Sequence, residues 1–217
     1  MNGQQQPHKI DIQGWSFRVQ QSTEPSSDQR VMLMLHGHLG NENAMWILSQ
    51  PLPSSYHFLA PRAPVKTGED QYSWHEIAPQ WPGLKTYRDL SDQLLSRVEA
   101  WSHEQNLNTH QYDVMGFSQG AVMAYALAIL QPSRVGKVAA LAGLIPQSWI
   151  DELEGQSLSG KSFFVAHGKQ DDIIPIKKAY QAADWLEDNG AHVTFCAADI
   201  GHRLSANCFN GLSEFFG

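Results

Sequence analysis

The stretch Gly116-Phe117-Ser118-Gln119-Gly120 has the pattern G-x-S-x-G, and its flanks decide the fold. Residues 111–115 before it are typical of a short buried strand, and residues 121–130 after it are typical of a buried helix. A serine at such a sharp strand-to-helix turn sits in a strained backbone conformation and presents its hydroxyl at the top of a sheet. We therefore predict that Ser118 is a nucleophile. The alternative is an ordinary connection in which Ser118 only caps the helix.

Strand-like and helix-like segments alternate outward from this turn, which predicts a mostly parallel central sheet with helices on both faces. About seven strands are expected, at residues 10–19, 31–35, 56–60, 111–115, 138–142, 162–166 and 192–197. Helices are expected at residues 43–48, 85–104, 119–130, 176–189 and 204–216. Residues 60–85 form a long irregular stretch, which in a compact domain is usually functional or mobile. We expect residues 1–217 to form one α/β domain without a large lid domain.

Composition and charge narrow the class of protein. Hydrophobic residues make up 42% of the chain and charged residues 17%, which is typical of a globular domain. The formal net charge is −7 and Lys and Arg do not cluster, so we expect no nucleic-acid partner. An anionic membrane surface would repel such a chain, and its apolar runs are shorter than a bilayer span, so no stable membrane insertion is expected.

The two cysteines and the polar N-terminus bear on the cellular compartment. Cys196 and Cys208 are too few for a disulfide framework, which favours a reducing compartment. Cys196 falls in an expected strand and is interpreted as a buried small hydrophobic residue. Residues 1–9 lack the apolar stretch of a signal peptide. We therefore expect a cytoplasmic protein.

A serine nucleophile needs a histidine base, and the base needs a carboxylate to orient it. In chains with this serine turn, the order is serine, acid, histidine. Here Asp171 and Asp172 follow the strand expected at residues 162–166, and His202 follows the last expected strand. Because the carboxyl ends of parallel strands meet at one edge of a sheet, Ser118 and His202 can converge with an acid from the earlier loop. Asp199 is a third candidate acid, although it is better interpreted as a polar loop residue.

Several motifs in order along the chain resemble the carboxylesterase, lysophospholipase and acyl-protein thioesterase family of α/β-hydrolases. The matching segments are residues 35–42, 60–65, 73–74 and 116–120, His167-Gly168 with Asp171 and Pro175, and Gly201-His202. The resemblance implies an α/β-hydrolase fold. In the acid loop, the family pattern His-Gly-x-x-Asp-x-x-Val-Pro selects Asp171 over Asp172.

The resemblance also implies an oxyanion hole and a substrate pocket. Its backbone donors would be Gln119 and His38, but Leu39 stands where a glycine often follows, so either His38 or Leu39 could give the second N–H group. The family places a Ser-Trp pair near the acyl pocket, here with Trp74, and plain core packing is the alternative for that side chain. Trp81 and Leu204 are also candidates for substrate binding.

Metal and cofactor chemistry are not expected. His36 and His38 lie two residues apart, but no Cys or acidic ligand follows at a familiar metal-binding spacing. The triad chemistry needs neither a metal nor a cofactor.

These residues together predict a serine esterase that hydrolyses short- to medium-chain carboxylic esters through an acyl-enzyme. Thioesters are an open alternative. Short chains are favoured because the one sizeable insertion, residues 60–85, is mostly polar. A lysophospholipase or acyl-protein thioesterase is the second hypothesis, and a non-catalytic ligand-binding protein on the same fold is the third. The expected partner is a small acyl ester, and a homodimer is left open.

Overall fold

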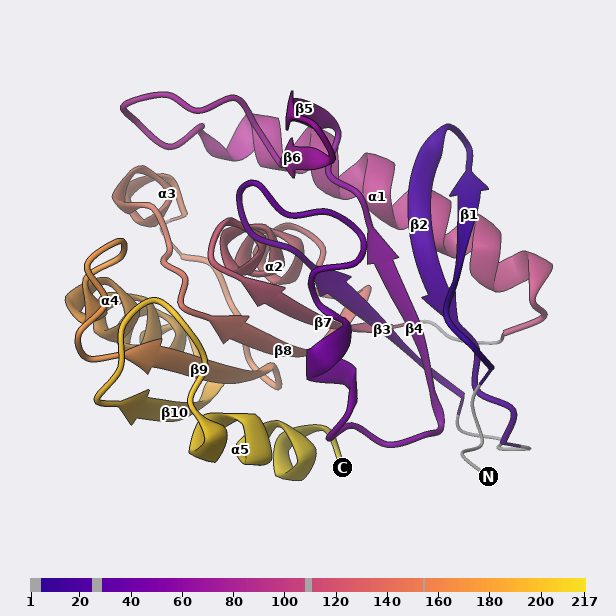
Figure 1. The fold of residues 1–217 in the computed structure, drawn as a ribbon. Coiled ribbons are helices and arrows are strands. Elements are labelled where there is room, and N and C mark those ends of the chain that lie inside the picture. The colour runs from indigo at the N-terminus through magenta and orange to yellow at the C-terminus, as the bar shows by residue number, and fades with distance from the viewer. Residues whose placement is uncertain (1–4, 25–28, 108–110, 154) are drawn as a thin grey trace.

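An eight-stranded sheet organises the chain in the computed structural model, which describes residues 5–24, 29–107, 111–153 and 155–217 (Figure 1). Residues 1–4, the start of the polar N-terminal stretch, lie outside the described residues. The strands, in spatial order, are β1 (His8–Ile12), β2 (Trp15–Gln20), β4 (Tyr56–Pro61), β3 (Arg30–Leu35), β7 (Tyr112–Phe117), β8 (Val135–Leu141), β9 (Ser162–Gly168) and β10 (His192–Ala198). The pairings β1–β2 and β2–β4 are antiparallel, and all other neighbours are parallel. The expected mostly parallel sheet is confirmed.

The eighth strand arises from a hairpin at the start of the chain. The sequence predicted one strand over residues 10–19, and this was wrong. Gln13 and Gly14 have φ angles of +50° and +82°, and Ile12 pairs directly with Trp15. Two consecutive left-handed residues make the tight two-residue turn that suits an antiparallel hairpin.

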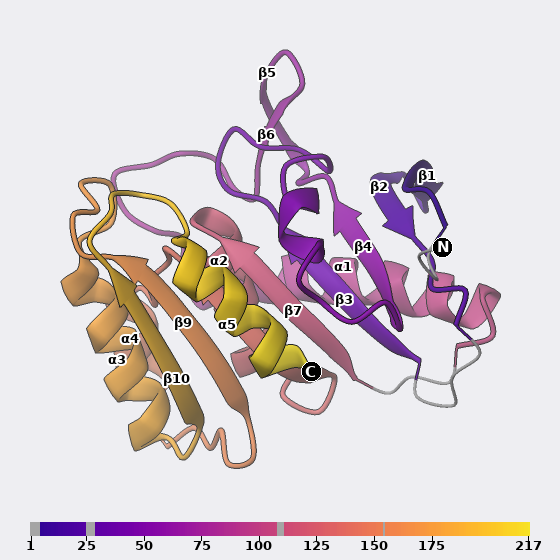
Figure 2. The ribbon, with the colours of Figure 1, turned by 60° about the horizontal axis from the view of Figure 1, so that its bottom comes forward.

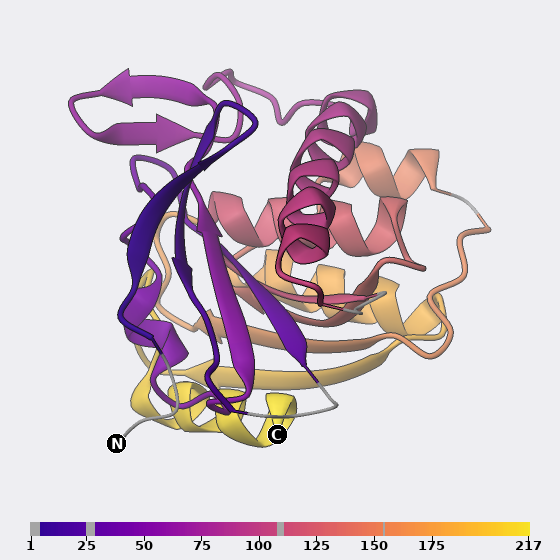
Figure 3. The same ribbon diagram turned by 90° about the vertical axis from the view of Figure 1, so that its right-hand side faces the viewer.

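The sheet separates two hydrophobic cores, because successive side chains of a strand point to opposite faces. In β3, Val31, Leu33 and Leu35 belong to the larger core, while Met32 and Met34 belong to the smaller one. The helices are α1 (Leu84–Glu104), α2 (Gln119–Leu130), α3 (Gln147–Glu152), α4 (Ile176–Asp188) and α5 (Ala206–Phe216). Helix α5 covers the face opposite α1 and α2 (Figures 2 and 3). Both faces are therefore buried, which explains the continuous apolar runs in the central strands.

Two loop regions carry structure that the sequence did not predict. The helix expected at residues 43–48 is a short 3₁₀ turn, η1 (Trp46–Ser49), and the six-residue helix α3 was not expected. The stretch 60–85 contains a two-stranded hairpin, β5 (Val65–Gly68) and β6 (Gln71–Ser73), which projects from the body of the molecule (Figure 2). Among the described residues, no helix combines the length and apolarity needed to cross a bilayer.

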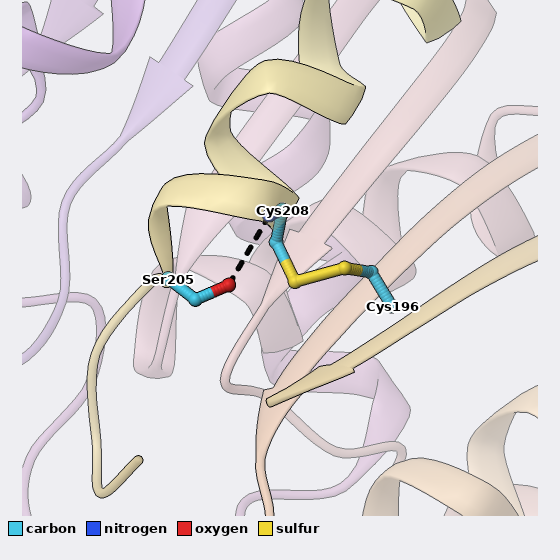
Figure 4. Close-up of a disulfide and its surroundings, with 3 residues drawn as sticks. All are labelled: Cys196, Ser205 and Cys208. Carbon is cyan, nitrogen blue, oxygen red and sulfur yellow. Dashed lines mark hydrogen bonds between the residues drawn. A yellow bond between two sulfur atoms is a disulfide. The ribbon is translucent and has the colours of Figure 1, made fainter. Parts of the chain in front are cut away.

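The two cysteines form a disulfide, which corrects the expectation that Cys196 is a free buried thiol. Cys196 in β10 is bonded to Cys208 in the first turn of α5 (Figure 4). Disulfides persist mainly in oxidising compartments. The cysteine pair therefore no longer supports the expected reducing compartment.

Candidate active site

Ser118 occupies the turn between β7 and α2 with a left-handed backbone, φ +55° and ψ −118°. A side chain on Gly116 would collide with the carbonyl oxygen of Gly120, and one on Gly120 would collide with that of Leu35. The Ser118 N–H group donates to the carbonyl oxygen of Leu141 at 2.8 Å. Close packing on both sides thus holds a conformation that a non-glycine residue rarely adopts.

Ser118, His202 and Asp171 form a continuous hydrogen-bonded chain. Nε2 of His202 lies 2.9 Å from Oγ of Ser118, and Nδ1 of His202 lies 2.7 Å from Oδ2 of Asp171. The three side chains come from the loops after β7, β9 and β10, at the carboxyl ends of neighbouring strands. In this arrangement Asp171 can hold the Nδ1–H tautomer and leave Nε2 free to take the serine proton.

Asp171 is held as an anion. Only 7% of it is exposed, and burial opposes ionisation, but hydrogen bonds from the Ile174 N–H, from His202 and from the Ile173 N–H together hold its pKa below the ordinary value. The two amide bonds reach Oδ1 at 2.8 and 2.9 Å. An ionised Asp171 at neutral pH can stabilise the imidazolium that forms on His202.

The other two candidate acids lie elsewhere. Asp172 is exposed, and the Asp199 side chain points away from the site to pair with Lys169 at 3.2 Å, with 74% of its surface exposed. Of the three aspartates considered, the structure places only Asp171 against His202.

Two histidines at strand ends bond to loop backbone. Nε2 of His36 accepts from the Ala63 N–H at 3.0 Å, so Nδ1 carries the proton and donates to the Gly37 carbonyl at 2.7 Å. Nε2 of His167 donates to the Ile174 carbonyl at 2.7 Å and lies 3.2 Å from Oδ2 of Asp171. His167 thereby holds the loop that carries Asp171 in place. Among the described residues, no group of three or more His, Cys, Asp or Glu side chains could hold a metal ion.

Two candidate oxyanion donors, His38 and Leu39, lie in a tight turn that lines the same pocket as Ser118. The Gly40 N–H donates to the Gly37 carbonyl at 3.0 Å, and Leu39 within that turn has φ +63°. Within the described part of the chain, no hydrogen bond occupies the backbone N–H of His38, Leu39 or Gln119. These amides are therefore free to bind an oxyanion. The left-handed angle at Leu39 explains why glycine suits that position.

The Gln119 side chain, at the start of α2, bonds to the end of β6 and to the two residues that follow it. The sequence did not predict these bonds. Its Oε1 accepts from the Trp74 N–H at 3.0 Å, and its Nε2 lies 2.9 Å from Oγ of Ser73 and 3.0 Å from Nε2 of His75. The Trp74 indole N–H donates to the His36 carbonyl at 2.8 Å. Nothing in the residue types marks these bonds, because they join segments about 45 residues apart.

A largely apolar pocket of about 650 Å³ opens beside Ser118 and His202. Its apolar walls come from the turn after β3, from η1, from β7 and from α5: Leu39, Met45, Ile47, Leu48, Phe117, Leu204 and Phe209. Leu204 lines this pocket as expected. Trp74, with 1% exposure, and Trp81 do not line it. Trp74 instead packs in the core and donates its indole N–H to the His36 carbonyl, just before the turn at residues 37–40. Trp81 borders a separate groove near α3.

Comparison with known proteins defines the family. The model of the Phospholipase/Carboxylesterase family matches residues 16–217. This chain belongs to that family. Acyl-protein thioesterase 1 of Saccharomyces cerevisiae is 25% identical over 191 residues, which cover 80% of this chain and 83% of the yeast protein. A protein of Oryza sativa named as a probable inactive carboxylesterase is 25% identical over 204 residues, which cover 86% of this chain and 83% of the rice protein. Family membership alone therefore does not establish activity.

The fold of this family member is that of solved carboxylesterases. The crystal structure of the Bacillus cereus carboxylesterase superposes with a TM-score of 0.80, at 21% identity and with 93% of each chain covered. The expected α/β-hydrolase fold is confirmed.

A buried ion pair anchors the loop that leads from the oxyanion turn to η1. Only 2% of the Glu42 side chain is exposed, and its carboxylate makes a two-point contact with Arg62 at 2.7 Å for each bond. Burial opposes ionisation of Glu42, but hydrogen bonds from Arg62, from its own backbone N–H and from Lys9 together outweigh burial and lower its pKa to about 2. The pair therefore stabilises the folded protein only while Glu42 is ionised.

We predict that Glu42→Gln destabilises the protein in a pH-dependent way. Because the folded pKa lies below the unfolded one, the stabilisation is complete above about pH 4.5 and is lost as the pH falls toward 2. The free energy of unfolding at pH 7 should fall by roughly 3 kcal/mol, since one pKa unit corresponds to about 1.4 kcal/mol. Urea denaturation of both proteins between pH 3 and pH 7 measures this change in the free energy of unfolding. Asp70→Asn, at an exposed carboxylate 3.3 Å from Arg62, is the control and should change stability by under about 1 kcal/mol. Equal effects of the two variants would contradict the prediction.

Proposed function

We propose that this chain is a serine esterase that hydrolyses carboxylic esters through an acyl-enzyme, with thioesters as alternative substrates. The observation that carries the proposal is the hydrogen-bonded chain from Ser118 through His202 to Asp171. Membership of the Phospholipase/Carboxylesterase family supports the same reaction class. Ser118, His202 and Asp171 serve as nucleophile, base and orienting acid in this proposal.

The reaction follows from the geometry. Oγ of Ser118 attacks the acyl carbon while Nε2 of His202 takes its proton, and the backbone N–H groups of Gln119 and of His38 or Leu39 hold the oxyanion. His202 then gives the proton to the leaving alcohol or thiol, and the acyl group stays on Ser118. Water enters, loses a proton to His202 and attacks the ester carbon, which releases the acid and restores the serine.

A fluorophosphonate probe tests the proposal directly. It phosphonylates a serine only when a base and an oxyanion hole activate that hydroxyl, so we expect one label per chain, on Ser118. A purified protein that stays unlabelled and turns over none of a panel of p-nitrophenyl esters and acyl thioesters would support the rival reading as a ligand-binding protein.

The apolar pocket accounts for acyl binding better than the stretch 60–85 does. Its walls come from η1 and α5, so the polar character of residues 60–85 no longer argues for short chains. A volume of about 650 Å³ accommodates a medium acyl chain. We propose medium-chain acyl esters as the substrate class. Peak activity at twelve or more carbons would instead favour a lysophospholipase or an acyl-protein thioesterase, the activity for which the yeast relative is named.

Narrowing the pocket should shift the acyl-chain preference. Ile47 on η1 lines the pocket and is 58% exposed, so Ile47→Trp adds bulk at the acyl site without disturbing the core. We expect kcat/KM for p-nitrophenyl octanoate to fall about tenfold while the value for the acetate changes less than about twofold. The control is Ile77→Trp, at a position that is 63% exposed and does not line the pocket. If octanoate and acetate turnover fell equally in Ile47→Trp, the acyl chain would lie elsewhere.

A further inference from the structure

His202 lies on a short segment between two elements that the disulfide joins. Residues 199–205 connect the end of β10 to the start of α5. Cys196 lies in β10 before this segment, and Cys208 lies in α5 after it, 12 residues further along the chain. The candidate catalytic base therefore sits inside the loop that the disulfide closes.

The first half of this segment is anchored to the acid loop by backbone contacts. The Lys169 N–H donates to the Ala198 carbonyl at 2.8 Å, and the Gln170 N–H donates to the Ile200 carbonyl at 3.0 Å. A side chain on Gly168 would collide with the carbonyl oxygens of Ile200 and Gly201, so the two loops touch backbone to backbone. These contacts end just before His202.

The second half has no such anchor. Among the described residues, the backbone from His202 to Leu204 makes one hydrogen bond, from the Arg203 N–H to the Gly201 carbonyl at 2.8 Å, and that bond stays within the segment. The path after His202 is set by α5. Oγ of Ser205 accepts from the Cys208 N–H at 3.1 Å and so caps the helix. Apart from its side-chain bonds to Asp171 and Ser118, His202 is therefore held on this side by the start of α5.

The disulfide fixes the start of α5 to β10. The Cα atoms of Cys196 and Cys208 lie 5.7 Å apart, and the bond joins the sheet to the helix at the turn that Ser205 caps (Figure 4). We propose that the Cys196–Cys208 disulfide is a positioning cross-link for His202, and that its reduction lowers turnover. The inference rests on the proposed esterase function. Cutting this short closed loop frees the segment that follows His202, whereas residues 198–200 stay bonded to the acid loop.

Turnover is sensitive to small displacements of this histidine. His202 must keep Nε2 at 2.9 Å from Ser118 while Nδ1 stays 2.7 Å from Asp171. A misplacement of about 1 Å can cost roughly 10²-fold in rate. Much of the pocket wall, by contrast, comes from the turn at 37–40 and from η1, which the disulfide does not touch.

A thiol can reach the bond from outside the acyl pocket. Cys196 lines a groove of about 540 Å³ between β10 and α5, with Lys137, Phe164 and Phe215 among its walls, whereas Cys208 is buried. A dithiol reductant would attack Sγ of Cys196 as a thiolate, and Cys208 would leave as a thiolate and take up a proton. The second reductant thiol then attacks the mixed disulfide, which releases Cys196 as a thiol and the reductant as a cyclic disulfide.

The experiment compares the oxidised protein, protein reduced with dithiothreitol and then desalted without oxygen, and Cys196→Ala/Cys208→Ala. Fluorophosphonate titration counts active sites, so that kcat is expressed per labelled serine. We expect kcat for p-nitrophenyl octanoate to fall at least about tenfold in the reduced protein and in the double variant, with KM within about threefold, and to recover when the reduced protein is reoxidised.

A variant destabilised at another place tests whether a general loss of stability, rather than a displaced His202, lowers kcat. Leu186→Ala in α4 removes a fully buried side chain from the larger core, whereas Cys208 belongs to the smaller one, and the temperature of measurement is set so that this variant and the double variant are both folded. Leu186→Ala should keep wild-type kcat. The proposal is overturned if it loses as much kcat as the double variant, if the double variant keeps kcat within about twofold, or if the unreduced protein, denatured, shows two free thiols.

Amide hydrogen exchange gives a readout that needs no catalysis. Reduction should raise exchange at the N–H groups of Arg203, Cys208 and Phe209, which hydrogen bonds protect, and leave β7 and β8 unchanged. This measurement decides the positioning role even if the oxidised protein hydrolyses no ester, in which case the proposed function fails separately. Unchanged exchange at these three N–H groups after reduction would overturn the cross-link proposal.

Discussion

Ser118→Ala is expected to lower kcat for p-nitrophenyl esters by about 10⁴- to 10⁶-fold. The substitution removes the hydroxyl that Nε2 of His202 contacts at 2.9 Å, so no acyl-enzyme can form. The residual rate should come from water in a site whose oxyanion donors remain. Steady-state kinetics with purified protein and loss of fluorophosphonate labelling measure the effect together.

The control for this variant is Ser91→Ala. Ser91 lies buried in α1, in an element that contributes no residue to the chain of Ser118, His202 and Asp171. It should keep full labelling and wild-type kcat, because only a hydroxyl is lost. Wild-type hydrolysis by Ser118→Ala would refute the nucleophile assignment and with it the proposed mechanism.

Asp171→Asn is expected to lower kcat by about 10⁴-fold while the protein stays folded. An amide in place of the carboxylate presents an NH₂ group to Nδ1 of His202, which favours the tautomer with the proton on Nε2, where it cannot accept from Ser118. The remaining amide oxygen can still accept from the Ile173 and Ile174 N–H groups. The expected loss is therefore catalytic rather than structural.

Asp172→Asn is the matched control, since it makes the same chemical change one residue along the same loop. Asp172 is exposed and does not contact His202, so kcat should change less than about twofold. Single-turnover kinetics would show slower acylation in Asp171→Asn alone. If Asp172→Asn were the slow variant, the acid would be misassigned.

The elements that the sequence predicted well are those with a strong local signal. The run before Ser118 and the run after it are uniformly apolar and are separated by glycines, and they form β7 and α2. The helix α1 carries one apolar stripe, and it was expected at nearly its observed bounds. Local composition indicates such elements because a strand or helix that is buried on both faces is apolar throughout, and one that is buried on a single face carries one apolar stripe.

The errors fall where neighbours override local signals. The turn at Gln13 and Gly14 was missed, although the apolar positions shift there from 10 and 12 to 15, 17 and 19. The 3₁₀ turn η1 and the helix α3 are too short for periodicity to indicate them. In each case the conformation is fixed by what packs against the segment.

The acyl pocket and the disulfide show the same limit at the level of the site. Trp74 was expected near the acyl chain, but its place is in the core, where its indole holds the oxyanion turn. The two cysteines were interpreted as too few for a disulfide framework, and Cys196 as a buried small hydrophobic residue, because only their number and local sequence were considered. The place of Trp74 and the pairing of the cysteines depend on distances between segments remote in the chain, and the sequence alone does not give these distances.

The sequence by itself determined the α/β architecture and the residues that can do chemistry, because apolar periodicity and the glycine-flanked serine are local properties that survive without a partner segment. Only the tertiary structure decided which side chains line the pocket and which two sulfur atoms meet, and it placed against His202 the aspartate that the family pattern had selected, Asp171. Those features depend on the packing of loops from separate strand ends, and packing is a property of the whole folded chain.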